Sequence, residues 1–125
     1  MGRWQDGDKM YRTDPWMDDF TRIPQSVHDE FASAVLEHDK VVEINLCAML
    51  FNLTYTDHFK RQYLEYLADL DRRGVKLSIG TDCHNDCYIG ICRWHPRCEV
   101  SLAAAERMLE SVGIRGDRLW RLPPR

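Results

Sequence analysis

Residues 78–84 read Ser-Ile-Gly-Thr-Asp-Cys-His, and this stretch decides the expected fold. Lys76–Gly80 alternates apolar and polar side chains and is β-prone, and the glycine at its end lets another group approach the backbone closely. Asp82 and His84 follow, and on an extended segment side chains two residues apart point the same way. A carboxylate and an imidazole are the pair that hydrolytic metal sites use most. The stretch predicts either a metal site after a buried strand or, more simply, a turn-capping aspartate beside a loop histidine.

A second β-branched segment lies upstream, at Val41–Leu46. Glu43 and Asn45 fall on one face of this expected strand, opposite Val42 and Ile44. If the strand is central in a sheet, the two polar groups line the wall of a polar site. If it is an edge strand, the same face is simply open to water.

The segment between the two strands predicts the best-defined helix of the chain, His58–Arg73. Thr56 or Asp57 caps its start, and Gly74 follows its end. Its apolar stripe consists of Phe59, Tyr63, Leu67 and Leu70. A strand, a helix and a strand in this order predict a βαβ unit whose strands are parallel neighbours, and therefore a fold of the α/β class.

The βαβ arrangement has a consequence for function. In such units the loops at the carboxyl ends of the strands build the site. Asn45 ends the first strand, whereas Asp82 and His84 follow the second, so the three polar groups converge if the strands are adjacent. This convergence favours the metal-site interpretation of Asp82 and His84.

The flanking segments carry weaker signals. Residues 1–25 show no clear period and are expected to form an irregular surface segment, held in place by aromatic side chains such as Phe20. Ser26 resembles the start of a capping box and predicts a helix over Val27–Glu37. Its buried face is expected to include Val27, Phe31, Ala34 and Val35, with His28 on the polar face.

The carboxyl-terminal part predicts one more helix and a short strand. The helix should span Ser101–Val112, with Leu102, Ala105 and Leu109 pointing inward. Leu119–Leu122 is expected to form a short terminal strand.

Length and composition restrict the class of protein. The chain has 125 residues, 44% hydrophobic and 30% charged, which suits one soluble globular domain. Its net charge of −3 and scattered basic residues give no sign of a nucleic-acid interface. No apolar run approaches the roughly 18 residues of a membrane span, and the first twenty residues are too polar for a signal peptide. A cytoplasmic location is therefore expected, with no membrane partner.

Four cysteines and a histidine lie within residues 83–98, the first of them between the two predicted metal ligands. This loop contains Cys83, Cys87, Cys92, His95 and Cys98. Thiolates and imidazoles at such density can close a tetrahedral zinc site, although no Cys-x-x-Cys pair is present. The alternatives are a structural zinc loop or small buried thiols packed under a helix.

Four motifs in this order give the chain a resemblance to a known family. They are Glu43-Ile44-Asn45, Arg73-Gly74-Val75, Ile79–His84 and Val112-Gly113-Ile114. In combination they resemble the polymerase and histidinol phosphatase (PHP) family, whose members are metal-dependent phosphoesterases built on a distorted (β/α)7 barrel. The resemblance implies that residues 26–125 form the carboxyl-terminal part of such a domain, a partial barrel of parallel strands with flanking helices.

The resemblance also implies roles for individual residues. Asp82 and His84 match the last two metal-ligand positions of the family, and the ion would be zinc, manganese or iron. Glu43 and Asn45 match a strand that lines the cleft, where they would support the metal ligands or face a phosphate-ester substrate.

The departures from the family pattern imply a partner. The family's opening His-x-His, its bridging Glu and its mid-chain His-Pro have no counterpart in this sequence. Two strong candidate ligands hold metal weakly, and half a barrel leaves a sheet edge and an apolar face uncovered. We therefore expect association with a complementary amino-terminal half or with a second copy. A non-catalytic domain that binds zinc through residues 83–98 and a protein through its open face is the alternative.

Overall fold

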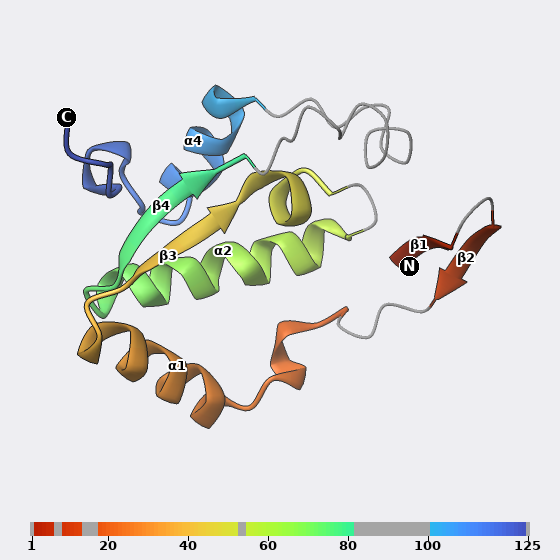
Figure 1. The fold of residues 1–125 in the computed structure, drawn as a ribbon, viewed down its shortest axis with the longest axis horizontal. Helices are drawn as coiled ribbons and strands as arrows, with labels where there is room; N and C mark the ends of the chain where they lie inside the picture. Colours follow the sequence, from red (N-terminus) through yellow and green to blue (C-terminus); the bar gives the residue numbers. More distant parts are fainter. Residues whose placement is uncertain (1, 7–8, 14–17, 53–54, 82–100, 125) are drawn as a thin grey trace.

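A computed structural model describes residues 2–6, 9–13, 18–52, 55–81 and 101–124 of the chain (Figure 1). Its elements in chain order are β1 (Gly2–Asp6), β2 (Lys9–Thr13), η1 (Phe20–Arg22), α1 (Gln25–Glu37), β3 (Val41–Asn45), η2 (Leu46–Leu50), α2 (Asp57–Arg72), β4 (Lys76–Gly80), α4 (Leu102–Glu110) and η4 (Gly116–Arg118). None of the helices in these ranges is long and apolar enough to span a membrane.

The predicted βαβ unit is present. Strands β3 and β4 pair in parallel, with Val42 opposite Leu77 and Ile44 opposite Ile79. Helix α2 connects them and lies alongside the two strands in Figure 1. The fold is therefore α/β, with a small parallel sheet and flanking helices.

The two faces of this sheet differ sharply in character, because paired residues of a parallel sheet share a face and alternate along each strand. The apolar face carries Val42, Ile44, Leu77 and Ile79, and Ile44 and Leu77 are fully buried there. The opposite face carries the pairs Val41–Lys76, Glu43–Ser78 and Asn45–Gly80. No side chain of this second face is fully buried.

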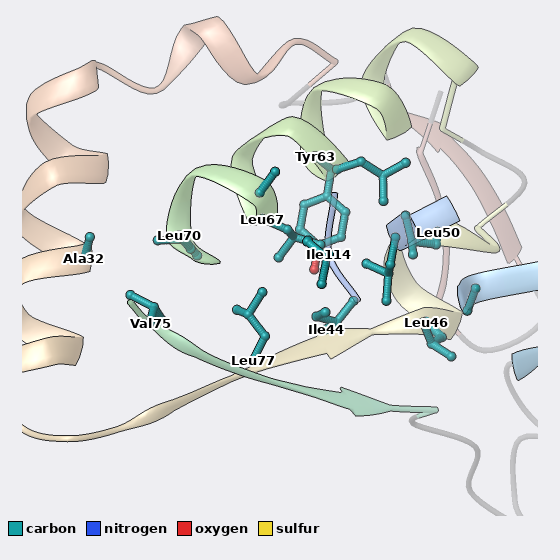
Figure 2. Packing of buried hydrophobic residues seen from close by; sticks show 14 of the residues in the cluster. Ala32, Ile44, Leu46, Leu50, Tyr63, Leu67, Leu70, Val75, Leu77 and Ile114 are labelled. Carbon is teal, nitrogen blue, oxygen red and sulfur yellow. The ribbon is translucent and has the colours of Figure 1, made fainter. Parts of the chain in front are cut away.

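Helix α2 supplies more of the core residues than any other element (Figure 2). Its four predicted inward residues, Phe59, Tyr63, Leu67 and Leu70, are all buried. The predicted cap is also present, because the Phe59 backbone N–H donates to Thr56 Oγ1 at 3.1 Å. Gly74 follows the helix with φ of 90°, a conformation that a glycine adopts without strain.

Helix α1 differs from its expected orientation. It begins at Gln25 behind Pro24, without a side-chain cap, so the predicted cap at Ser26 is wrong. Ala32 and Val35 are its buried residues, whereas Val27 and Phe31 are 49% and 43% exposed. The helix thus packs through its small side chains and leaves the larger apolar ones uncovered by the described part of the chain.

The chain termini also depart from expectation. Residues 2–6 and 9–13 form an antiparallel hairpin in the segment that was expected to be irregular. At the other end, the Trp120 backbone N–H donates to the Leu77 carbonyl oxygen at 2.7 Å, alongside the outer edge of β4. This single bond follows the 3-10 turn η4 and does not amount to the predicted strand at Leu119–Leu122. Leu102, expected to point inward, is 55% exposed.

Two leucine-to-alanine substitutions should show that a buried leucine contributes to the free energy of unfolding and that an exposed one does not. Leu67→Ala removes a side chain that is 1% exposed and should lower the free energy of unfolding by about 2–5 kcal/mol, because it leaves a cavity beneath the sheet. Leu102→Ala, the matched control, should change it by at most about 0.5 kcal/mol. Urea unfolding of both variants measures the difference, and equal losses would contradict the described core.

Candidate functional site

The carboxyl ends of β3 and β4 lie side by side. Asn45, the last residue of β3, is paired with Gly80, the last residue of β4. In the sequence Asp82, a predicted metal ligand, follows Gly80 by two positions. Asp82 and His84 themselves lie outside the described residues, as do Cys83, Cys87, Cys92, His95 and Cys98 of the alternative zinc loop.

Glu43 lies directly over Gly80. A Cβ atom built on Gly80 would lie 2.8 Å from Glu43 Cγ and would overlap the carboxyl group of Glu43. The Glu43 side chain therefore occupies the space that a side chain at residue 80 would need. This is the close approach predicted for the glycine. The contact brings the exposed Glu43 carboxylate to the end of the sheet from which Asp82 follows.

At the same end of the sheet, the side chain of Asn45 makes a structural hydrogen bond. Its side-chain oxygen accepts a hydrogen bond from the Ala48 backbone N–H at 2.7 Å. The amide thereby caps η2, the single π-helical turn that follows β3. Support of a metal ligand or contact with a substrate by Asn45 stays a prediction, and the oxygen would have to share its lone pairs with this cap.

Tyr63 lies beneath Asn45 and was expected only as part of the core stripe of α2. Burial raises the pKa of the Tyr63 phenol to about 12, and the nearby Tyr66 and Glu43 act in the same direction. A hydrogen bond from the Asn45 backbone opposes this shift. The Tyr63 hydroxyl thus stays neutral near pH 7 and ties the middle of α2 to the end of β3.

The donor set of this site can be compared with the needs of a divalent ion. Glu43 offers a carboxylate and Asn45 an amide oxygen, and both are oxygen ligands that manganese or iron accepts. Within the described residues no three His, Cys, Asp or Glu side chains gather to hold a metal. A metal site at this end of the sheet therefore stays a prediction that rests on Asp82 and His84, which lie outside the described residues.

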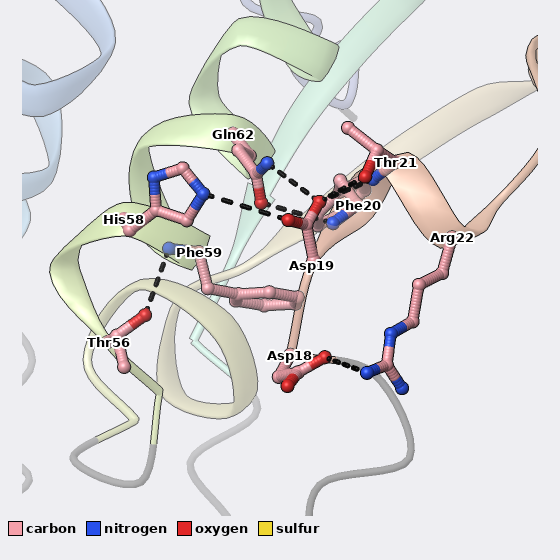
Figure 3. Close-up of polar contacts among 9 residues, drawn as sticks. All are labelled: Asp18, Asp19, Phe20, Thr21, Arg22, Thr56, His58, Phe59 and Gln62. Carbon is pink, nitrogen blue, oxygen red and sulfur yellow. Dashed lines mark hydrogen bonds and ion pairs between the residues drawn. The ribbon is translucent and has the colours of Figure 1, made fainter.

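A second group of polar side chains links the segment that precedes α1 to helix α2 (Figure 3). The Phe20 backbone N–H donates to Gln62 Oε1 at 3.1 Å, and Gln62 Nε2 donates to Asp19 Oδ1 at 2.9 Å. Asp19 also accepts from the Thr21 backbone N–H at 2.8 Å and from its hydroxyl at 2.6 Å. These bonds hold Phe20 against Phe59, with ring centroids 5.0 Å apart.

Comparison with protein-family models, with curated proteins and with solved structures finds no match.

The contact between Glu43 and Gly80 can be tested by a double-mutant cycle. Gly80→Ala should lower the free energy of unfolding by about 1 kcal/mol, because the added methyl group displaces the Glu43 side chain. In a Glu43→Ala background the same change should be close to neutral. Urea unfolding of the four proteins gives the coupling energy, and additive effects would show that the two residues do not touch.

The Asp19 group predicts a dependence of stability on pH. Hydrogen bonds from Thr21, first from its hydroxyl and then from its backbone, lower the pKa of Asp19 from 3.8 to about 2. Because the folded pKa lies below the unfolded one, this contribution is complete above about pH 4 and disappears as the pH falls toward 2. Asp19→Asn should therefore flatten the fall in urea midpoint between pH 5 and pH 2.5.

The matched control for this prediction is Asp18→Asn. Asp18 is the neighbouring carboxylate and pairs with Arg22 at the surface, at 3.0 Å (Figure 3). The control should keep the wild-type pH profile. A profile that changes equally in both variants would contradict the role of the Asp19 group.

Proposed function

We propose that this chain is the carboxyl-terminal half of a PHP-like, metal-dependent phosphoesterase. In this proposal Asp82 and His84 hold a divalent metal ion, and residues 26–125 form the last βα units of a partial (β/α)7-type barrel. The single observation that carries the proposal is the register of β3 and β4, which pairs Asn45 with Gly80 just before Asp82. Ligands at the carboxyl ends of parallel strands are typical of sites in such barrels.

The roles of the residues follow from the two faces of the sheet. The face that carries Glu43 and Ser78 is not covered by a helix of the βαβ unit, and in the proposed barrel it would face the interior. Glu43 would support the metal ligands or face the substrate, at the position over Gly80 that the packing gives it. When bound, a zinc, manganese or iron centre supplies an activated water and binds the oxygens of a phosphate ester.

Completion by a partner is part of the same proposal. Within the described residues the parallel sheet has two strands and no helix on its polar face, and Val27 and Phe31 expose apolar surface on α1. These features support association with a complementary amino-terminal half or with a second copy. The chain would work in the cytoplasm, hydrolysing a phosphate ester only after this association.

The alternative proposal is a non-catalytic domain. In it residues 83–98 hold a structural zinc ion through Cys83, Cys87, Cys92, His95 and Cys98, and the open face of the sheet binds a protein. The density of thiols in this loop favours it. The two proposals differ in which ligands hold the metal.

Metal analysis of the purified chain distinguishes the proposals. After incubation with zinc or manganese and removal of the excess, Asp82→Ala/His84→Ala should abolish metal binding, because the two strongest ligands are gone. Cys92→Ser/Cys98→Ser should leave it unchanged. Elemental analysis measures the metal per chain, and circular dichroism confirms that each variant is folded.

The opposite pattern would overturn the phosphoesterase proposal. Metal that persists in Asp82→Ala/His84→Ala but disappears in Cys92→Ser/Cys98→Ser would support the zinc-loop domain. Wild-type protein that is folded and takes up neither metal would contradict both proposals.

A further inference from the structure

A pocket of about 320 Å³ lies between η1, the start of α1 and the middle of α2. Its lining includes Phe20, Ile23, His28, Glu65, Tyr66 and Asp69. The residues come from two segments about forty positions apart in the sequence. The volume is at the lower end of the range for small-molecule sites. The carboxyl ends of β3 and β4 contribute no residue to it, so its occupant is independent of the metal site.

Three aromatic rings form one wall of the pocket. The ring centroids of His28 and Tyr66 are 4.8 Å apart, and those of Phe20 and Tyr66 are 5.6 Å apart. His28 also stacks on Phe20, with centroids 6.3 Å apart and an interplanar angle of 17°. His28 was expected on the polar face of its helix, but it is partly buried among these rings. Ring faces carry negative charge density and attract cations.

Two carboxylates of α2, the helix that also carries Tyr66, line the same pocket. Glu65 and Asp69 lie one turn apart on α2, and no Lys or Arg is among the described residues that line the pocket. Asp69 already pairs with Arg73 at 2.8 Å. Glu65 is exposed and has no ion pair with a described residue. The pocket thus combines a cation-attracting wall with one carboxylate that is available to a ligand.

The pocket is also formed in advance. Gln62 holds the Phe20 backbone at 3.1 Å and the Asp19 carboxylate at 2.9 Å, which fixes one aromatic ring before any ligand arrives (Figure 3). Phe20 further packs on Tyr63, with centroids 5.8 Å apart. A preformed pocket avoids part of the entropic cost of binding.

We propose that this pocket binds an organic cation, a guanidinium group on a short alkyl arm. Guanidinium is planar, stacks on aromatic faces and forms paired hydrogen bonds to a carboxylate. The pocket lining offers both kinds of partner, the ring of Tyr66 and the carboxylate of Glu65. The alkyl arm lies against Phe20 and Ile23. The cation is either a free small molecule or an arginine side chain of a peptide.

The test is a titration of the full chain with butylguanidinium, followed by two-dimensional amide NMR. We expect saturable shifts that centre on η1 and on residues 62–69, with weaker binding of butylammonium and none of butanol. Glu65→Gln should weaken binding about fivefold, the effect of an exposed ion pair. Tyr66→Leu should weaken it by a similar factor through loss of the ring face.

Glu106→Gln is the matched control, because Glu106 is an exposed carboxylate on α4 outside the pocket. It should leave the affinity unchanged. A blocked tripeptide with a central arginine serves as the second probe, and the tighter of the two probes identifies the source of the cation. The proposal is overturned if neither probe saturates, if butanol binds as well as butylguanidinium, or if Glu65→Gln and Glu106→Gln have equal effects.

Discussion

The packing of α2 against one face of β3 and β4 is the interaction on which the rest of the structure depends. Leu67 and Leu70 of the helix are buried together with Ile44 and Leu77 of the sheet. Burial of each such side chain contributes about 1.5–3 kcal/mol, so this contact fixes both the parallel pairing and its register. Because side chains alternate along each strand, covering the apolar face leaves Glu43 and Asn45 on the opposite, polar face of the sheet.

This dependence explains which parts of the fold could be predicted from the sequence. Three signals predict the same helix α2: its apolar period, its cap at Thr56 and the glycine that follows it, Gly74. The structure has each of them. In α1 the apolar period predicts a buried face of Val27, Phe31, Ala34 and Val35, but of these only Val35 is buried, together with Ala32. Periodicity identifies an apolar face, but it cannot tell whether the described chain supplies a neighbour to cover it.

The candidate sites were predictable to different degrees. The glycine at the end of β4 predicted a close contact, yet only the side-chain packing showed that Glu43, which pairs with Ser78 in the sheet, makes it. The hairpin at residues 2–6 and 9–13 carries no clear alternation and was not expected. The pocket of Phe20, His28 and Tyr66 could not be predicted, because its walls are brought together by the turn before α1 and not by local sequence.

The central claim is that a metal ion binds where β4 ends, beside the polar end of β3. Its most direct test is a titration of the isotopically labelled chain with Mn²⁺, read as paramagnetic broadening of assigned backbone amide signals. The account predicts that Asn45, Gly80 and Thr81 broaden first and that Asp82→Ala/His84→Ala removes the effect. Broadening that centres elsewhere, or that is the same in this double variant, would contradict it.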